Sequence, residues 1–176
     1  MNIFKKETGF TRTPKFGVTP KGGGFTLIEL LVVVAIIGVL ATITLGYIGQ
    51  AKLKGADTGV KSNLATTRSV AEIFFLDNFN SYLPPGGLTF EIATCPIYDP
   101  LGTNMLSKDQ VIAASIAEAI AKGSGSACYN SDSTWAVAVG LKLTPGASWC
   151  VDVTGAAKMV NSDPLAAINS STFICN

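Results

Sequence analysis

The sequence contains no histidine, the side chain whose unperturbed pKa lies closest to neutral pH and which most often serves as a general acid or base. It also contains neither a G-x-x-x-x-G-K-[ST] phosphate loop nor a G-x-S-x-G nucleophile elbow. We therefore predict that the chain is not an enzyme, has no active site and needs no cofactor.

Charge is scarce as well, because only 14% of the residues are charged, with 13 basic residues against 12 acidic ones. A nucleic-acid-binding protein needs a concentrated basic surface, so this composition argues against that class. Asp152 and Asp163 have no E-x-x-E or EF-hand neighbourhood, and we interpret them as solvated surface carboxylates. We expect no metal site.

Long apolar runs are absent except for one, residues 25–48, in which Glu29 is the only charged residue. About 20 apolar residues suffice to cross a bilayer as a helix, so we predict a transmembrane helix over residues 25–50. Residues 1–24 before it carry a net charge of +4, from five basic residues and one acidic residue. Basic residues beside a span stay in the cytoplasm, and we expect the bulk of the chain on the other side of the membrane.

Residues 1–24 have no apolar core of their own, although a conventional secretory signal has its apolar region before the cleavage site. Pro14, Pro20 and the glycines at 22–24 favour an extended, flexible leader that a protease can bind. The alternative is an uncleaved signal-anchor with a cytoplasmic tail.

Residues 51–83 continue the apolar span with the pattern of an amphipathic helix that has one buried face. We predict one helix from the span to about residue 80, ended by the prolines and glycines at 84–87. The apolar positions recur in steps of three or four: Leu53, Ala56, Val60, Leu64, Thr67, Ala71 and Phe74.

Residues 84–176 form the predicted globular domain. We interpret residues 88–106 as loop and predict a short helix at about 108–122, with Ser107 and Gln110 as a capping box and Gly123 as its stop. After a flexible link, three antiparallel strands are predicted within about 134–161, at Thr134–Leu143, Ser148–Thr154 and Ala157–Asn161, followed by a tail over 162–176.

The strand pattern predicts which side chains share a face. Trp135, Val137, Val139, Leu141 and Leu143 alternate on one face of the first strand, while Cys150 and Asp152 lie opposite Trp149, Val151 and Val153 on the second. Three strands are too few to be stable alone, so we expect the striped helix to cover them. The predicted fold is α+β, and the two tryptophans are core residues rather than a ligand platform.

Four cysteines, Cys95, Cys128, Cys150 and Cys175, all follow the apolar span. An even number outside the cytoplasm suits two disulfides, and no C-x-x-C pair indicates zinc. Three connectivities are possible. We favour Cys95–Cys128 and Cys150–Cys175, because each pair ties a loop or tail to its nearest ordered neighbour.

The residues G-F-T-L-I-E-L-L at 24–31, followed by an unbroken apolar run, resemble the N-terminal signature of type IV pilins and their pseudopilin relatives. This resemblance covers about 30 residues, and the rest of the chain fits the family in architecture only. It implies cleavage after Gly24 by a membrane-embedded prepilin peptidase and N-methylation of Phe25. It also implies that Glu29 attracts the terminal amine of a neighbouring subunit during assembly.

The resemblance further implies a structural subunit of a helical homo-oligomeric filament, served by inner-membrane pilus assembly machinery. Before assembly the chain would cross the inner (cytoplasmic) membrane once, with its C-terminal domain outside the cytoplasm, and afterwards it would lie in a cell-surface filament. Gly38, Gly46 and Gly49 each weaken a helix by about 0.8–1.0 kcal/mol relative to alanine. They either allow close helix packing or, as the resemblance supports, let the helix extend locally in the filament.

Other interpretations remain open. A pseudopilin or minor pilin of a type II secretion or DNA-uptake system has the same N-terminus. A membrane-tethered adhesin or ligand-binding module would need a pocket that core packing does not explain. A calcium site in the C-terminal loops, as in some pseudopilins, is a further alternative to solvated carboxylates.

Overall fold

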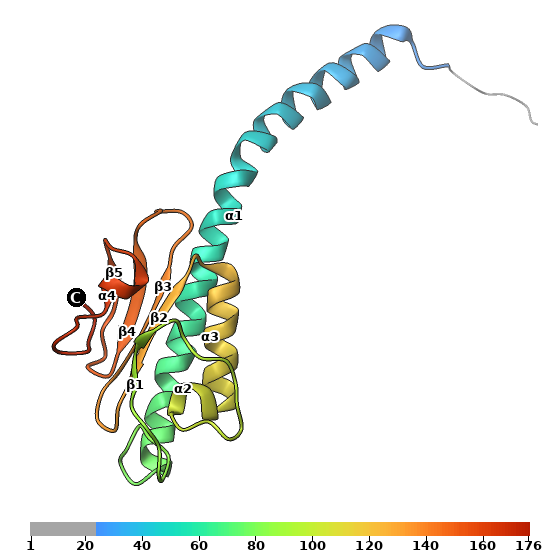
Figure 1. The fold of residues 1–176 in the computed structure, drawn as a ribbon. Coiled ribbons are helices and arrows are strands. Elements are labelled where there is room, and N and C mark those ends of the chain that lie inside the picture. The colour runs from blue at the N-terminus through green and yellow to red at the C-terminus, as the bar shows by residue number, and fades with distance from the viewer. Residues whose placement is uncertain (1–23) are drawn as a thin grey trace, which may run out of the picture. The chain divides into compact units, whose positions relative to one another are not determined.

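The computed structural model describes residues 24–176, apart from the side chains at positions 45 and 46. Most of the predicted leader, residues 1–23, lies outside the described residues. The chain divides into two units, the first ending at Thr42 and the second comprising Ile43–Asn176. Helix α1, Leu27–Asp77, runs through the boundary between them, as the sequence predicts for a single long helix (Figure 1).

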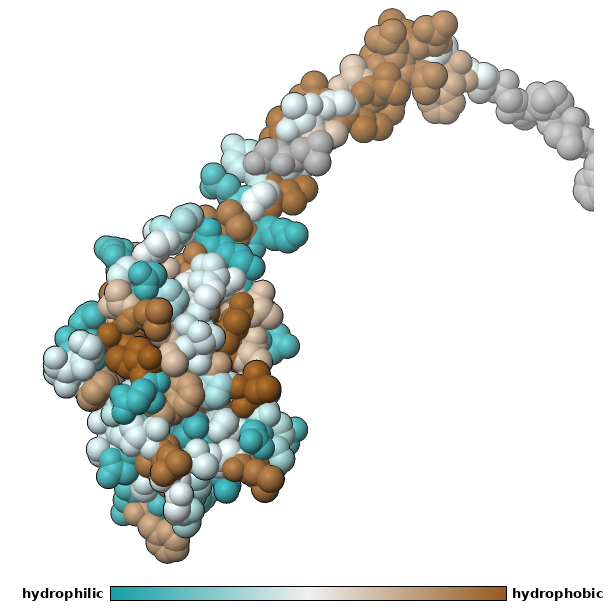
Figure 2. All heavy atoms as spheres, viewed as in Figure 1, coloured by the Kyte–Doolittle hydropathy of each residue, from teal (hydrophilic) through white to brown (hydrophobic). Residues whose placement is uncertain are grey.

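The described part of the first unit, residues 24–42, is helical from Leu27 and exposes all of its side chains. Its apolar residues cover the surface of the helix as a nearly continuous brown region in Figure 2. Leu27 is 81% exposed and Val33, one of the least exposed, still 47%. Residues 24–42 therefore form no hydrophobic core of their own.

In the second unit, α1 buries the stripe that the sequence predicts. Val60, Leu64, Thr67, Ala71 and Phe74 are all buried, and the apolar ones belong to the core between α1 and the sheet. The stripe begins later than predicted, because Leu53 is 37% exposed. Leu53 lies one turn before Asp57, whose carboxylate accepts hydrogen bonds from the connection between the third and fourth strands.

The sheet has five antiparallel strands in the order of the chain. It confirms the predicted α+β class, in which the long helix packs on an antiparallel sheet. The strands are β1 Phe90–Ala93, β2 Ser126–Asn130, β3 Trp135–Gly140, β4 Ser148–Asp152 and β5 Ala157–Val160.

Two of these strands were missed from the sequence, which predicts loop at 88–106 and a flexible link before residue 129. β1 has only four residues and its pairing with β2 shifts register between Phe90 and Ala93. β2 is buried at every position, so its sequence S-A-C-Y-N does not alternate between apolar and polar residues.

The sheet is covered on both faces rather than on one. Trp135, Val137, Val139 and Val151 face α1 in one core. The opposite face packs Ala136, Ala138 and Cys150 against the C-terminal segment, which contains the short helix α4, Pro164–Ala167. Leu143 does not join the predicted face, because β3 ends at Gly140 and Leu143 is 40% exposed.

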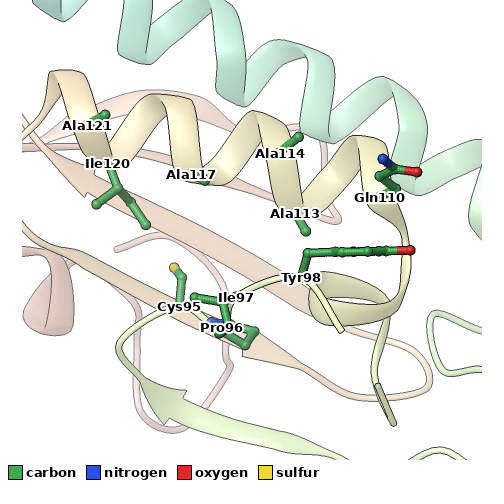
Figure 3. A pocket seen from close by; sticks show the side chains of 10 residues that line it. All are labelled: Cys95, Pro96, Ile97, Tyr98, Gln110, Ala113, Ala114, Ala117, Ile120 and Ala121. Atoms are coloured by element: carbon green, nitrogen blue, oxygen red, sulfur yellow. The ribbon is translucent and has the colours of Figure 1, made fainter. Parts of the chain in front are cut away.

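The short helix is divided into α2, Met105–Lys108, and α3, Gln110–Lys122. The predicted capping box at Ser107 is wrong, because Ser107 lies within α2. The N-cap of α3 is Asp109, whose carboxylate accepts hydrogen bonds of 2.9 Å from the amides of Val111 and Ile112. Gly123 caps the C-terminus as predicted. Figure 3 shows α3 lying beside residues Cys95–Tyr98.

Helix α1 ends at Asp77, before the predicted stop at residues 84–87. Its end is a left-handed turn, in which Phe79 and Asn80 have φ angles of 57° and 59°. The amide of Asn80 donates to the carbonyl of Phe75 at 2.9 Å, so the turn satisfies a carbonyl that the helix leaves free.

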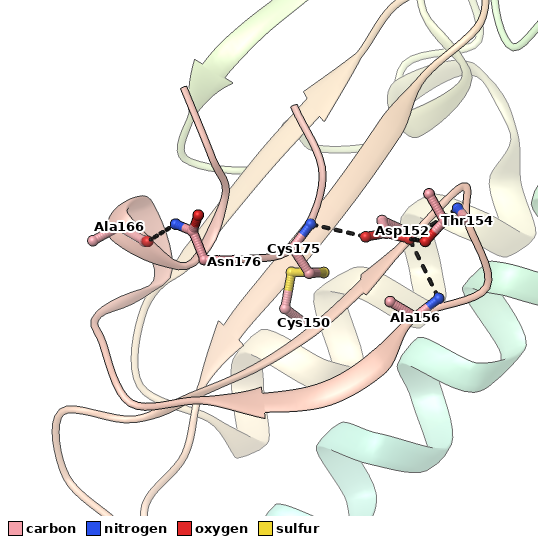
Figure 4. Close-up of a disulfide and its surroundings, with 7 residues drawn as sticks. All are labelled: Cys150, Asp152, Thr154, Ala156, Ala166, Cys175 and Asn176. Atoms are coloured by element: carbon pink, nitrogen blue, oxygen red, sulfur yellow. Dashed lines mark hydrogen bonds between the residues drawn. A yellow bond between two sulfur atoms is a disulfide. The ribbon is translucent and has the colours of Figure 1, made fainter. Parts of the chain in front are cut away.

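Two disulfides, Cys95–Cys128 and Cys150–Cys175, join the four cysteines in the pairing favoured from the sequence. Cys150–Cys175 holds the C-terminus against β4, and Asp152 supports it (Figure 4). The Asp152 carboxylate accepts hydrogen bonds from the amide of Cys175 at 2.8 Å and from Thr154. Asp152 is only 1% exposed, so the prediction of a solvated carboxylate is wrong at this position.

Candidate processing and assembly site

The start of α1 holds Glu29 in a reciprocal set of hydrogen bonds with Thr26. The Glu29 carboxylate accepts from the amide of Thr26 at 2.9 Å and from its hydroxyl at 2.8 Å. The Thr26 hydroxyl in turn accepts from the amide of Glu29 at 3.3 Å. This is the capping box pattern, which satisfies amides that the first helical turn leaves without partners.

Sequence reasoning missed Thr26, although T-L-I-E at 26–29 is the spacing of a capping box. The hydrogen bonds with Thr26 hold the Glu29 carboxylate at the N-terminus of the helix, where the partial positive charge of the helix favours an anion.

Phe25 and Glu29 line one shallow hollow of about 350 Å³ together with Ile28, Val32 and Val33. Phe25 is 84% exposed, and Gly24 lies in the non-helical segment before α1. The predicted cleavage residues are thus placed next to the predicted assembly carboxylate, on a surface that the described part of the first unit leaves open.

The predicted flexible glycines all lie within α1. A Cβ atom added at Gly38 or Gly49 would meet nothing within 4 Å, so packing within the chain does not require glycine at either position. The surroundings of Gly46 lie outside what the structure describes. The role of all three glycines stays a prediction.

Helix α1 is long and apolar enough to cross a membrane, judged by length and composition. None of its most apolar 18-residue window is buried within the described structure. A helix that forms the core of a globular domain passes the same length test, but it is mostly buried. The exposure of this window therefore differs from that of a core helix, whereas a signal sequence near the N-terminus passes the same test.

The other residues considered for a functional role, the tryptophans, the carboxylates and the cysteines, lie in the second unit. Trp135 is fully buried in the core, and Trp149 packs partly against it with Lys61 4.5 Å above its ring centroid. Among residues 24–176, no group of three or more acidic, cysteine or histidine side chains is arranged to hold a metal ion. All four cysteines are used in disulfides.

A protein-family model matches the same segment. The model of the prokaryotic N-terminal methylation motif matches residues 20–45. A fimbrial protein of Moraxella nonliquefaciens is 45% identical over 58 residues, which cover 29% of this chain and 38% of that protein. The type IV wide pilus major component PilA4 of Thermus thermophilus is 42% identical over 59 residues, or 34% of this chain and 44% of that protein.

The chain thus spans about two fifths of the length of these two curated relatives. No solved structure matches it. A long apolar helix continues into a disulfide-bonded α+β domain, which is a pilin-like layout. The matched motif and the two relatives confirm the resemblance to the type IV pilins that the residues from Gly24 to Glu29 indicate.

Proposed function

We propose that this chain is a structural subunit of a type IV pilus-like filament. The observation that carries the proposal is the first unit, in which a methylation motif begins an apolar helix whose side chains are all exposed. Burying this surface contributes roughly 25 cal/mol per Å² of apolar area. The helices of neighbouring subunits would bury it in the core of the filament.

Processing is proposed at the junction before α1. Prepilin peptidase cuts after Gly24, and the new amino terminus at Phe25 is N-methylated. Residues 24–26 lie outside the helix, which supports this assignment because proteases cut segments that are not held in regular structure. The basic leader stays on the cytoplasmic side, and the second unit lies on the far side of the inner membrane.

Assembly is proposed to use the charge of Glu29. The amine of Phe25 in a neighbouring subunit would approach the carboxylate, and an ion pair is far stronger in a medium of low dielectric constant than in water. The capping box supports this role, because it already holds the carboxylate at the open end of the helix. The local flexibility assigned to Gly38, Gly46 and Gly49 would help the helix to leave the membrane.

A pseudopilin or minor pilin of a secretion or DNA-uptake machine would use the same N-terminus, and abundance at the cell surface separates the two functions. The main test is the intact mass of protein sheared from the cell surface. We expect a species that begins at Phe25, carries one additional methyl group and lacks four cysteine hydrogens.

Two outcomes of this measurement would change the proposal. The same processed mass found only in the membrane fraction would favour the pseudopilin or minor pilin. A mass that retains residues 1–24 would support an uncleaved signal-anchor instead.

A Glu29→Val variant tests the assembly step. We expect normal cleavage and methylation but few or no surface filaments, because the variant loses the carboxylate that pairs with the neighbouring amine. Thr26→Val is the matched variant, since it removes the two hydrogen bonds of the Thr26 hydroxyl and leaves the Glu29 carboxylate in place. Normal filaments from Glu29→Val would contradict the pairing.

A further inference from the structure

Phe79 combines two unfavourable features at one position. Its side chain is 90% exposed, and its backbone has a φ angle of 57°. Left-handed backbone is disfavoured for any residue with a Cβ atom, and glycine usually occupies this position after a helix. Strain at a bulky residue is a reason to ask what function it serves.

Phe173 is a second phenylalanine with left-handed backbone, and its ring packs against another residue of the same chain. It has the same φ angle of 57°, but its ring stacks on Tyr129 at a centroid distance of 4.1 Å and an interplanar angle of 9°. The packing of this ring covers the second face of the sheet. Phe79 has the same backbone conformation, yet its ring is left in solvent.

Two exposed apolar side chains of α1 precede Phe79 in the chain. Ile73 and Leu76 precede it at a spacing of three residues and are 57% and 72% exposed. Ile73 and Leu76 share one face of α1, because residues three apart are neighbours on a helix. We call Ile73, Leu76 and Phe79 the α1 end patch. Side chains of this size are normally the first to be buried.

The second unit also contains an apolar groove that its own side chains leave open. The groove has a volume of about 480 Å³ and lies between α3 and the segment Cys95–Tyr98. Figure 3 shows the small side chains Ala113, Ala114 and Ala117 along one wall, which leave room above the segment opposite them. Ile97 on that segment is 85% exposed.

We propose that this groove receives the α1 end patch, with Phe79 at its centre, from a second copy of the chain. The inference rests on the proposed filament. Groove and patch are different surfaces of one domain, so the contact is heterologous, and a heterologous contact repeats into an open helical assembly instead of closing as a dimer. This is the symmetry that a filament needs.

The contact between the patch and the groove is too small to hold two free subunits together, but it can form between subunits that a filament already holds side by side. An aromatic side chain buries about 150–250 Å², and Ile73 and Leu76 are smaller and already partly covered. The patch therefore buries less than the roughly 800 Å² that each partner contributes to a stable free-standing interface. Helices bundled in a filament core raise the effective concentration of neighbouring domains. The contact is therefore expected in filaments and not between free subunits.

The test uses Phe79→Gly in the full chain expressed in its own cells. Glycine relieves the left-handed strain, so we expect the melting temperature of the purified subunit to rise by about 2–4 °C. We expect the same variant to yield at least several-fold fewer sheared filaments than the unmodified chain. Phe79→Leu keeps an apolar side chain and should restore most of the yield.

Two controls separate the contact from folding. Phe173→Gly loses the stacking on Tyr129 and should lower the melting temperature, in contrast to Phe79→Gly. Ala117→Glu places a charge in the groove and should reduce filaments, whereas Leu165→Glu changes an exposed apolar residue on α4 and should not.

A photoreactive benzoylphenylalanine at position 79 identifies the partner. We expect a cross-linked dimer of the chain whose adduct maps to residues 95–98 or to α3. Adducts elsewhere, or normal filaments from both Phe79→Gly and Ala117→Glu, would overturn the inference while leaving the filament itself intact. An unmodified chain that forms no filaments would refute the proposed function, and the inference with it.

Discussion

The two halves of α1 belong to one helix but differ in what surrounds them. Residues 27–42 are exposed at every position, whereas residues 57–74 place a buried stripe against the sheet. The first half is apolar at 13 of its 16 positions and the second at only 7 of its 18 positions. The arrangement of the apolar residues differs as well.

In the first half, apolar residues occupy all sides of the helix, which is typical of a helix surrounded by lipid or by other helices. In the second half they recur in steps of three or four and leave polar residues on the opposite side. The comparison teaches that the first half stabilises an assembly and the second half stabilises a domain. Substitutions in the two halves should therefore affect different measurements.

The largest expected difference is between Leu64→Ala and Ile37→Ala. Leu64 is fully buried, and its truncation should lower the free energy of unfolding of the domain by about 2–5 kcal/mol. Ile37 is 59% exposed, and its truncation should change that free energy by less than about 0.5 kcal/mol. Tryptophan fluorescence during denaturant unfolding in detergent measures both, because both tryptophans lie in the domain.

An equal loss of stability from the two variants would break the comparison, because it would mean that the first half also packs on the domain. Reduced filament yield from Ile37→Ala, without a change in the free energy of unfolding, would show that the first half of α1 acts in assembly and not in folding.

An intermediate effect is expected at Asp57, where the second half first meets the sheet. Its buried carboxylate accepts hydrogen bonds from the amides of Lys142 and Leu143 at 2.8 and 3.2 Å. Asp57→Ala leaves these amides unpaired, which should cost about 1–3 kcal/mol. Asp77→Ala is the matched control, because this carboxylate is exposed on the same helix. Similar losses from both variants would show that the carboxylate of Asp57 does not fasten the loop.

The smallest effect concerns Tyr82, which packs near the end of the second half. Burial, followed by the hydrogen bond to Glu72, raises the pKa of Tyr82 from 10.0 to about 12. Its contribution to stability is therefore complete below about pH 10 and is lost as the pH rises through about 12. Absorbance at 295 nm follows the titration, and Tyr82→Phe removes the late transition.

Glu72→Gln should lower the pKa of Tyr82 only in part, because burial is the larger cause. A titration of Tyr82 near its ordinary value would show that the ring is solvated and does not pack against the end of α1.

The elements with a strong period were predicted from the sequence. The apolar stripe over 60–74 and the alternation in β3 and β4 each repeat a single period, and the structure contains them within a few residues of the predicted bounds. β1 and β2 could not be predicted this way, because one is short and irregular and the other is buried on both sides.

At the candidate site, the motif residues Gly24, Phe25 and Glu29 were predicted from a resemblance, and their roles await experiment. The hydrogen bonds between Thr26 and Glu29 depend on local spacing, and the sequence carried that signal. The sequence carried no signal for the conformation of Phe79, since phenylalanine disfavours a left-handed backbone.

The sequence by itself determined the N-terminal motif, the long helix and the α+β class, because these depend on residues close together in the chain. Only the tertiary structure decided which carboxylates are buried, that the sheet is covered on both faces and which apolar side chains remain uncovered. Those outcomes depend on contacts between segments far apart in sequence. Asp152 illustrates the difference: its position between the Thr154 turn and Cys175 makes a residue that looks solvated in the sequence one of the most buried carboxylates of the domain.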